Sequence, residues 1–127
     1  MTAPSSASQP PRPEAAAPSE RVLLARLALD AALGVPGVVS AHAGRFGTRV
    51  TADREERLSG VLATALADGG YAVELYLVSE AVPLHPLADR IRERVERAAA
   101  SAGLAAALRY VDIAIEDVVT PDETGMK

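Results

Sequence analysis

The sequence has no cysteine and no tryptophan, and it has two histidines. A chain without cysteine can form neither a disulfide framework nor a thiolate metal site, so His42 and His85 are its only other soft metal ligands. They are far apart and form neither an HxH nor an HxxxH pattern, which would bring two imidazoles to one metal. We interpret His42 as a loop residue and His85 as a helix-entry residue, and we predict no metal site, no cofactor and no thiol redox function.

Aromatic side chains are also scarce, at 3% of the chain, although 49% of its residues are apolar. The core must therefore be filled by leucine, valine, isoleucine and many alanines. An alanine side chain buries little area, and burial stabilises by only about 25 cal/mol per Å². The length of 127 residues allows one domain with one core. Association with a partner would be a natural supplement to its stability.

An excess of positive charge is missing as well, since the formal net charge is −4 and the pI is near 5.1. Proteins that bind duplex nucleic acid usually carry the opposite sign, because their cations displace the counterions of the phosphates. The first 18 residues lack the apolar run and the leading positive charge of a signal peptide. No uncharged apolar run reaches the ~18 residues of a membrane span. We therefore expect a cytoplasmic protein without a direct membrane span, and nucleic acid is not its expected partner.

The chain begins with a proline-rich segment and continues with a helix signal. Five prolines among residues 1–18 oppose helix and sheet, which predicts a disordered N-terminal tail. Ser19 offers an N-cap oxygen, and the following apolar-rich run reaches Leu33 before Gly34 ends it, which predicts the first helix. Its buried face is expected to include Leu23, Leu27 and Ala31, with Leu24 and Ala28 beside them.

Strand signals follow in the middle of the chain. Residues 60–67 and 71–79 flank Asp68-Gly69-Gly70, whose glycines can adopt a positive φ, and this predicts an antiparallel hairpin. A short strand is predicted near residues 47–52, and the charged cluster 53–57 is predicted to be a solvated loop or turn. In the second hairpin strand one alternate set of residues should face the core and the other should face outward: Tyr71, Val73, Leu75 and Leu77 against Ala72, Glu74, Tyr76 and Val78.

A second helix is predicted from about Leu84 to Ala102, and an alternating strand from Arg109 to Thr120. The expected apolar stripe of that helix is Leu84, Leu87, Ile91, Val95, Ala98 and Ala102. The order α-β-β-β-α-β predicts an α+β fold, a two-layer sandwich in which a small mixed or antiparallel sheet carries two helices on one face. We assign residues 19–119 to this single domain and residues 120–127 to a flexible C-terminal tail.

No arrangement of residues predicts catalysis. A nucleophile beside a base, or a motif on a rigid turn, is missing. Glu116 and Asp117 are adjacent, so in an extended strand their carboxylates point to opposite faces. The glycine-containing stretch 43–48 lacks the strand and helix that flank a phosphate-binding loop. Only Glu74 and Tyr76 suggest a small-molecule site or an enzyme. We predict no catalytic, cofactor-binding or metal-binding residues, and we expect that the protein is not an enzyme.

Two features raise the question of nucleic acid. Arg90, Arg94 and Arg97 have the helical spacing that follows a phosphate backbone or anionic lipid heads. Three carboxylates on the same helix, one of them in a Glu93–Arg97 i,i+4 pair, favour a salt-bridged solvent face instead. The sequence GVPG at 34–37 matches the GXXG of RNA-binding KH domains, but a KH clamp lies between two helices and needs free N–H groups. Here Pro36 lacks an N–H donor, and the residues that follow are expected to be irregular or a strand. A KH-like RNA-binding module is kept as the alternative function.

Four segments, in a definite order, carry a resemblance to a known family: GVPGVVSAHAGRFGT at 34–48, VELYLVS at 73–79, VPLHPLADRIRERV at 82–95 and VDIAIEDV at 111–118. The series resembles the alkaline-shock or general-stress proteins of Gram-positive bacteria. Members of that family show a VPGV helix exit, an alternating VEV-type strand, a P-x-x-A helix and a closing V-x-V strand. The resemblance covers about residues 20–119. It departs from the family at residues 79–81, where many members have an aromatic–glycine pair, and in the alanine-rich hairpin.

The resemblance implies a non-enzymatic cytoplasmic scaffold or protein-binding module that acts in the envelope stress response and in envelope homeostasis. It also implies protein partners, among them a small membrane-anchored protein that holds the chain at the cytoplasmic face of the membrane, and homo-oligomers. The family offers no catalytic residues to transfer to this sequence. The two departures bear on the partner surface more than on the fold.

Overall fold

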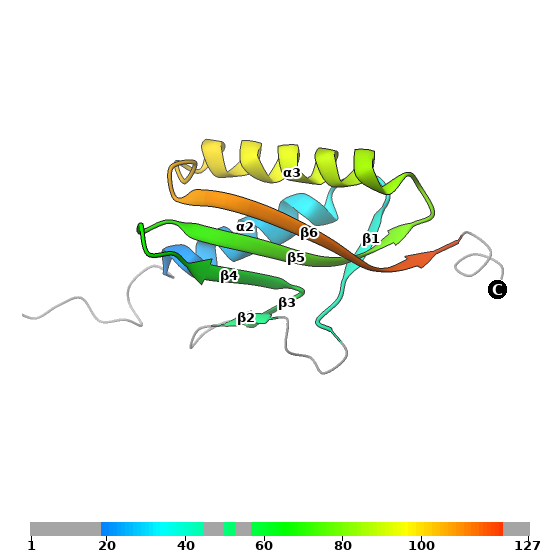
Figure 1. Cartoon of the computed structure of the whole chain (residues 1–127), viewed down its shortest axis with the longest axis horizontal. Coiled ribbons are helices and arrows are strands. Elements are labelled where there is room, and N and C mark those ends of the chain that lie inside the picture. The colour runs from blue at the N-terminus through cyan, green and yellow to red at the C-terminus, as the bar shows by residue number, and fades with distance from the viewer. Residues whose placement is uncertain (1–18, 45–49, 53–56, 121–127) are drawn as a thin grey trace, which may run out of the picture.

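The computed structural model describes residues 19–44, 50–52 and 57–120. The tail predicted at residues 1–18 lies outside the described residues, as do residues 121–127 of the other predicted tail. The elements follow in the order α2 (Glu20–Leu33), β1 (Val38–Ala41), β2 (Val50–Ala52), β3 (Arg57–Ser59), β4 (Val61–Ala65), β5 (Tyr71–Glu80), α3 (Leu84–Ser101) and β6 (Leu108–Val119) (Figure 1).

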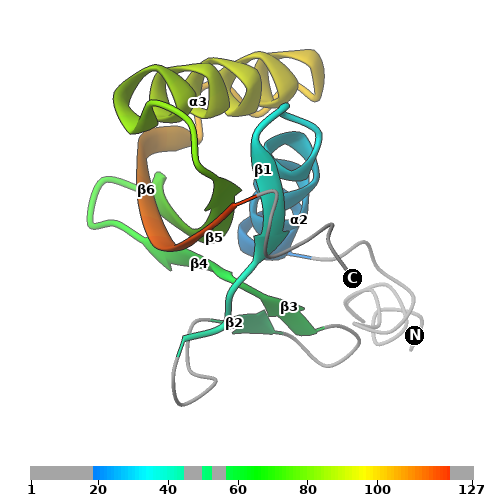
Figure 2. The ribbon, with the colours of Figure 1, turned by 90° about the vertical axis from the view of Figure 1, so that its right-hand side faces the viewer.

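The predicted fold class is confirmed: the structure is an α+β sandwich of one helix layer on a mixed sheet. α2 packs on β4 and β5, α3 packs on β6, and the two helices contact each other on that same face of the sheet (Figure 2). In Figure 1 the two helices run in opposite directions. A second, two-stranded sheet pairs β2 with β3, from Val50 opposite Ser59 to Ala52 opposite Arg57.

β5 is the central strand, and its neighbouring strands run both parallel and antiparallel to it. The predicted hairpin is confirmed: β4 runs antiparallel to the first half of β5, from Val61 opposite Leu75 to Ala65 opposite Tyr71. β1 runs antiparallel to the second half of β5 along the same edge. β6 runs parallel to β5 along the whole of the other edge. A parallel neighbour requires a crossover, and α3 supplies it.

Gly60 lies where one edge of β5 passes from β4 to β1. The backbone N–H of Tyr76 donates to the Gly60 carbonyl at 2.8 Å, and the Tyr76 carbonyl accepts from the His42 N–H at 2.8 Å. The φ of Gly60 is +87°, and a Cβ at this position would lie 2.6 Å from the Cβ of Ala41. The meeting of the two strands therefore requires a glycine.

The core lies between the sheet and the helices. The predicted inward face of β5 is confirmed for Val73, Leu75 and Leu77, which are fully buried, while Tyr71 is half-buried. The main cluster of buried residues is Ala25, Ala28, Leu29, Ala32, Val35, Val61, Ala63, Val73, Leu75, Leu77, Leu87, Ile91, Val95 and Val111. On the other face of β5, Tyr76 and Val78 are each 9% exposed.

α2 begins and ends where the sequence predicts. The Ser19 hydroxyl accepts from the Val22 N–H at 3.3 Å, and the Gly34 N–H donates to the Ala31 carbonyl at 3.2 Å. The predicted buried face is wrong in part, because it is centred elsewhere on the helix: Val22, Leu24, Ala25, Ala28, Leu29 and Ala32 are the buried residues. Leu23, Leu27 and Ala31 are only half-buried, since they lie beside α3 rather than over the sheet.

The stripe predicted for α3 holds in its middle and fails at its ends. Leu87, Ile91 and Val95 are fully buried, and Ala99 completes the buried row. Leu84 is 43% exposed and Ala102 is exposed, because four-residue steps drift around the helix axis.

Two strands were not predicted. β1 is Val38–Ala41, in a segment whose alternation is too short to signal a strand. β3 is Arg57–Ser59, so Arg57 is a strand residue rather than part of a loop. Of the strand predicted near 47–52, the described part is β2, and residues 53–56 of the predicted loop lie outside the described residues.

Candidate functional site: a groove between the two helices

A groove of about 650 Å³ runs between α2 and α3. The side chains that line its walls are all half-buried or exposed: Leu23, Arg26, Leu27, Asp30, Ala31, Arg94, Ala98, Ala102 and Leu104. The groove therefore opens on the solvent side of the helix layer. Its volume lies within the ~300–1,000 Å³ of typical ligand sites.

The spacing of residues in each helix explains the groove. On α2, Leu23, Leu27 and Ala31 recur every four residues and form one wall. On α3, Ala98 and Ala102 occupy the facing row, and their short side chains leave the space between the helices unfilled. Larger residues at these two positions would close the groove.

Leu104 closes the aliphatic end of the groove after α3 has ended. The Leu104 N–H donates to the Ala99 carbonyl at 2.8 Å, and Gly103 between them has a φ of +77°. A glycine with positive φ just after a helix turns the chain back over the last turn. This turn places a leucine at the groove beside Ala102.

The opposite end of the groove is charged. Arg94 Nη1 lies 3.8 Å from the point that a Cβ on Gly34 would occupy, so the guanidinium lies at the C-terminal end of α2. A cation is favoured there by the helix dipole. Arg94 is exposed and has no hydrogen bond or ion pair with any other described residue, and the same is true of Asp30 on the α2 wall. The groove thus runs from an aliphatic end to a charged end, where Arg94 and Asp30 have no partner among the described residues.

The two histidines have separate structural roles. His42 follows β1, donates its backbone N–H to Tyr76, and accepts the Gly44 N–H at Nδ1 at 3.0 Å. His85 is exposed in the first turn of α3. Among the residues that the structure describes, no group of three or more histidine, aspartate or glutamate side chains is arranged to hold a metal ion.

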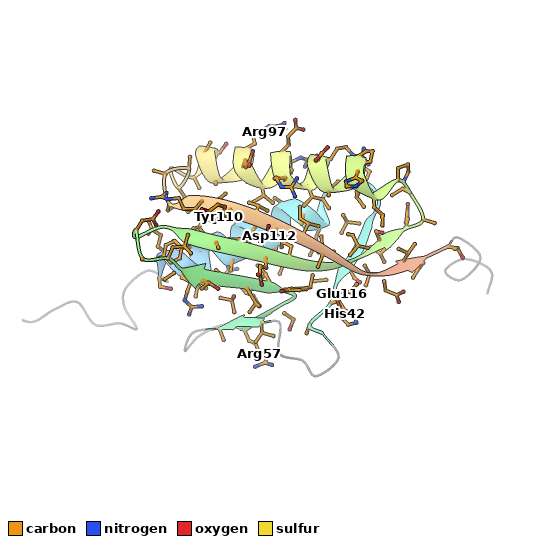
Figure 3. All side chains as sticks on the ribbon, viewed as in Figure 1. His42, Arg57, Arg97, Tyr110, Asp112 and Glu116 are labelled. Atoms are coloured by element: carbon orange, nitrogen blue, oxygen red, sulfur yellow. The ribbon has the colours of Figure 1, made fainter. Side chains whose placement is uncertain are left out.

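The carboxylates singled out in the strands do not form a pocket. The Tyr76 hydroxyl donates to Glu74 Oε1 at 2.6 Å, and Asp112 is opposite Glu74 in the β5–β6 register. Figure 3 shows Tyr110, Asp112 and Glu116 following one another along β6. Asp117 accepts its neighbour's amide, the N–H of Val118, at 2.9 Å. Glu74 and Asp117 thus have hydrogen-bond partners, and none of these carboxylates lines the groove.

The GVPG segment at 34–37 connects α2 to β1 and is used for packing. The Gly37 carbonyl accepts the Glu80 N–H at 2.8 Å, and a Cβ at Gly37, whose φ is +103°, would lie 3.2 Å from Leu87. A KH clamp needs backbone N–H groups that face an RNA ligand. Here the segment lies against β5 and the start of α3.

The arginines of α3 differ in their surroundings. Arg94 lines the groove, and Arg97 lies on the outer side of the helix (Figure 3). The predicted Glu93–Arg97 pair is not formed, and the ion pair on this helix is Arg92–Asp89 at 3.3 Å. Arg92 also donates from Nε to the Val111 carbonyl of β6 at 3.2 Å.

Asp68 has a lowered pKa for reasons that belong to the hairpin turn. Its Oδ1 accepts the Gly70 N–H at 2.9 Å, which is the main cause, and its Oδ2 accepts from Arg109 Nε at 3.0 Å. Both contacts stabilise the charged carboxylate. The side chain is exposed and lies outside the groove, so the lowered pKa marks a turn rather than a reactive site.

Comparisons of the chain with protein-family models, with curated proteins and with solved structures gave no significant match.

In the described part of the chain, neither helix combines the length and the apolar character needed to cross a membrane. Sequence reasoning missed the groove, because the aliphatic residues of its two helix walls were expected in the core. A signal was present: the apolar arc of α2 is wider than one sheet can cover.

Proposed function

We propose that the chain is a non-enzymatic protein-binding module that binds its partner in the groove between α2 and α3. The observation that carries the proposal is the groove itself, whose walls expose leucine and alanine side chains of two helices in a domain with few aromatic residues. A partner that covers these side chains would bury apolar area that the core leaves exposed.

The resemblance to alkaline-shock proteins supplies the biological setting of this proposal. In that setting the protein is a cytoplasmic scaffold of the envelope stress response, held at the membrane by a small membrane-anchored partner, and it self-associates. The net charge of −4 is in keeping with a protein partner rather than a nucleic acid.

The proposal is tested by filling the groove. Ala98→Trp places an indole in the groove, and Ala100→Trp places one on the exposed side of the same helix as the matched control. We expect the wild type and Ala100→Trp to retain the same partner from detergent-solubilised membranes and Ala98→Trp to lose it, with all three chains giving the same far-UV circular dichroism. The proposal fails if no protein is retained, or if both variants retain it equally.

Two further measurements bear on the alternatives. Salt-sensitive binding of a mixed RNA pool at low ionic strength would favour the KH-like module over a protein-binding module. Sedimentation of the purified chain over a range of concentrations tests self-association, and a monomer at every concentration would remove that part of the proposal.

A further inference from the structure

The two ends of the groove differ, and this difference limits what can bind. Leu23, Ala102 and Leu104 make one end aliphatic. Arg94 and Asp30 lie at the other end without hydrogen bonds or ion pairs to described residues. The charged side chains that line the groove are two cations, Arg26 and Arg94, and one carboxylate, Asp30, so the net charge of the lining is positive.

The walls of the groove favour a helix over an extended peptide. An extended peptide leaves backbone N–H and C=O groups that need partners. Leucine and alanine side chains offer none, and the polar side chains that line the groove are confined to Arg26, Asp30 and Arg94. A helix satisfies its own backbone groups and can pack its side chains between the ridges of α2 and α3.

The length of the groove sets the size of that helix. Arg94 and Ala102, the C-cap residue of α3, are eight residues apart, which corresponds to about 12 Å along the helix axis. A docked helix would cover this distance with about two turns, using apolar residues at positions i, i+4 and i+7. A carboxylate one turn beyond the last apolar residue would then lie beside Arg94.

We propose that the groove binds a short amphipathic helix of a partner protein, with an aliphatic stripe along the groove floor and an aspartate or glutamate that pairs with Arg94. This inference rests on the proposed function, because it names the chemistry of the partner at the same site. Arg94 selects for the acidic residue, and Asp30 disfavours a second carboxylate on the α2 side of the groove.

The test is a selection of peptides from a random display library against the full chain, with two variants. Arg94→Glu reverses the charge at the groove, and Arg97→Glu reverses an exposed charge on the same helix outside it. We expect the wild type to enrich helical peptides with i, i+4, i+7 aliphatic residues and an acidic residue at one end. Arg94→Glu should weaken the binding of these peptides about tenfold and should itself enrich peptides with Lys or Arg there. Arg97→Glu should bind the original peptides as the wild type does.

The outcomes separate this inference from the proposed function. If the selected peptides bind Ala98→Trp as tightly as the wild type, the groove is not the binding site. The proposed function and the inference of a bound helix are then both wrong. If they require the open groove but show no acidic preference, or bind Arg94→Glu equally well, only the charge assignment falls. Enrichment of extended or basic sequences in the groove would overturn the inference and leave the groove as a binding site.

Discussion

Gly60 shows how a single residue decides whether the sheet can form. At this position β4 leaves the edge of β5 and β1 takes its place, and the backbone of Tyr76 bonds to both segments. Replacement with alanine requires a positive φ, which costs about 1–2 kcal/mol. It also forces a methyl group against Ala41, and such overpacking typically costs about 1–3 kcal/mol.

We therefore predict that Gly60→Ala lowers the free energy of unfolding by about 3 kcal/mol, measured by urea denaturation. Gly69→Ala is the matched control, since its φ is +91° but nothing lies within 4 Å of an added Cβ. It should cost only the backbone strain, about 1 kcal/mol. Equal losses in the two variants would mean that the contact with Ala41 is relieved at no cost.

The stability of the fold depends on pH through the carboxyl group of Asp68. Its pKa is lowered in the folded chain, first by the Gly70 N–H and then by Arg109. A carboxyl with a depressed folded pKa stabilises the fold above its ordinary pKa of 3.8, and this contribution is lost as the pH falls through the lowered value.

We predict that Asp68→Asn is less stable than the wild type at neutral pH and that the difference disappears in strong acid. Denaturation curves over the acid range measure it. Arg109→Gln removes the guanidinium and keeps the Gly70 N–H, so the pKa of Asp68, followed by NMR, should rise in that variant but stay below its ordinary value. A wild-type Asp68 that titrates at that ordinary value would contradict this account.

At the scale of the elements, both open edges of the main sheet are contacted by side chains. On β4 the Thr51 hydroxyl of β2 donates to the Val61 carbonyl at 2.9 Å and accepts the Ala63 N–H at 3.0 Å. On β6 the Arg92 guanidinium of α3 covers the Val111 carbonyl. Unpaired edge groups are templates for pairing with other chains. The Thr51 contacts therefore disfavour the addition of a partner strand to β4 at Val61 and Ala63.

Thr51 is 2% exposed. Its hydroxyl bonds the Val61 carbonyl and the Ala63 N–H, as a neighbouring strand would do on this edge of β4. We predict that Thr51→Val costs about 2 kcal/mol, because two backbone groups lose their partner in a buried place while the shape of the side chain is kept. Hydrogen exchange at the Ala63 amide should accelerate in this variant. Thr51→Ser keeps the hydroxyl and should leave that amide protected, and similar exchange rates in both variants would mean that water replaces the hydroxyl.

The elements also show what the sequence could predict. The hairpin around Gly69, the N-cap of α2 at Ser19 and the inward positions of Val73, Leu75 and Leu77 follow from local chemistry and were predicted correctly. β1 could not be predicted, because Val38–Ala41 becomes a strand only through its pairing with β5. The parallel pairing of β6 likewise depends on where α3 returns the chain.

The groove escaped prediction for a related reason. A period of four residues identifies the apolar side of a helix but not which part of that side faces the sheet and which part faces the other helix. Leu27 and Ala98 have the same apolar character as Leu24 and Ala99, yet the first pair lines the groove and the second pair is fully buried. Only the relative placement of α2 and α3 separates the two pairs.

At the scale of the whole molecule, the composition of the core connects stability to binding. Tyr76 is the sole buried aromatic residue among the residues that the structure describes. Much of the remaining core is alanine and valine, which bury little area each. A ligand that binds only the folded groove stabilises the fold through mass action, by about 2.7 kcal/mol at a concentration 100 times its dissociation constant.

We therefore predict that a peptide selected for the groove raises the midpoint of thermal unfolding in a concentration-dependent way. At equal peptide concentration the increase should be smaller for Arg94→Glu, where the dissociation constant is larger, and absent for Ala98→Trp, where the groove is filled. Differential scanning calorimetry of the three chains with and without peptide measures this. A peptide that binds without shifting the midpoint would have to bind the unfolded chain equally well, and the groove between α2 and α3 would then not be what it recognises.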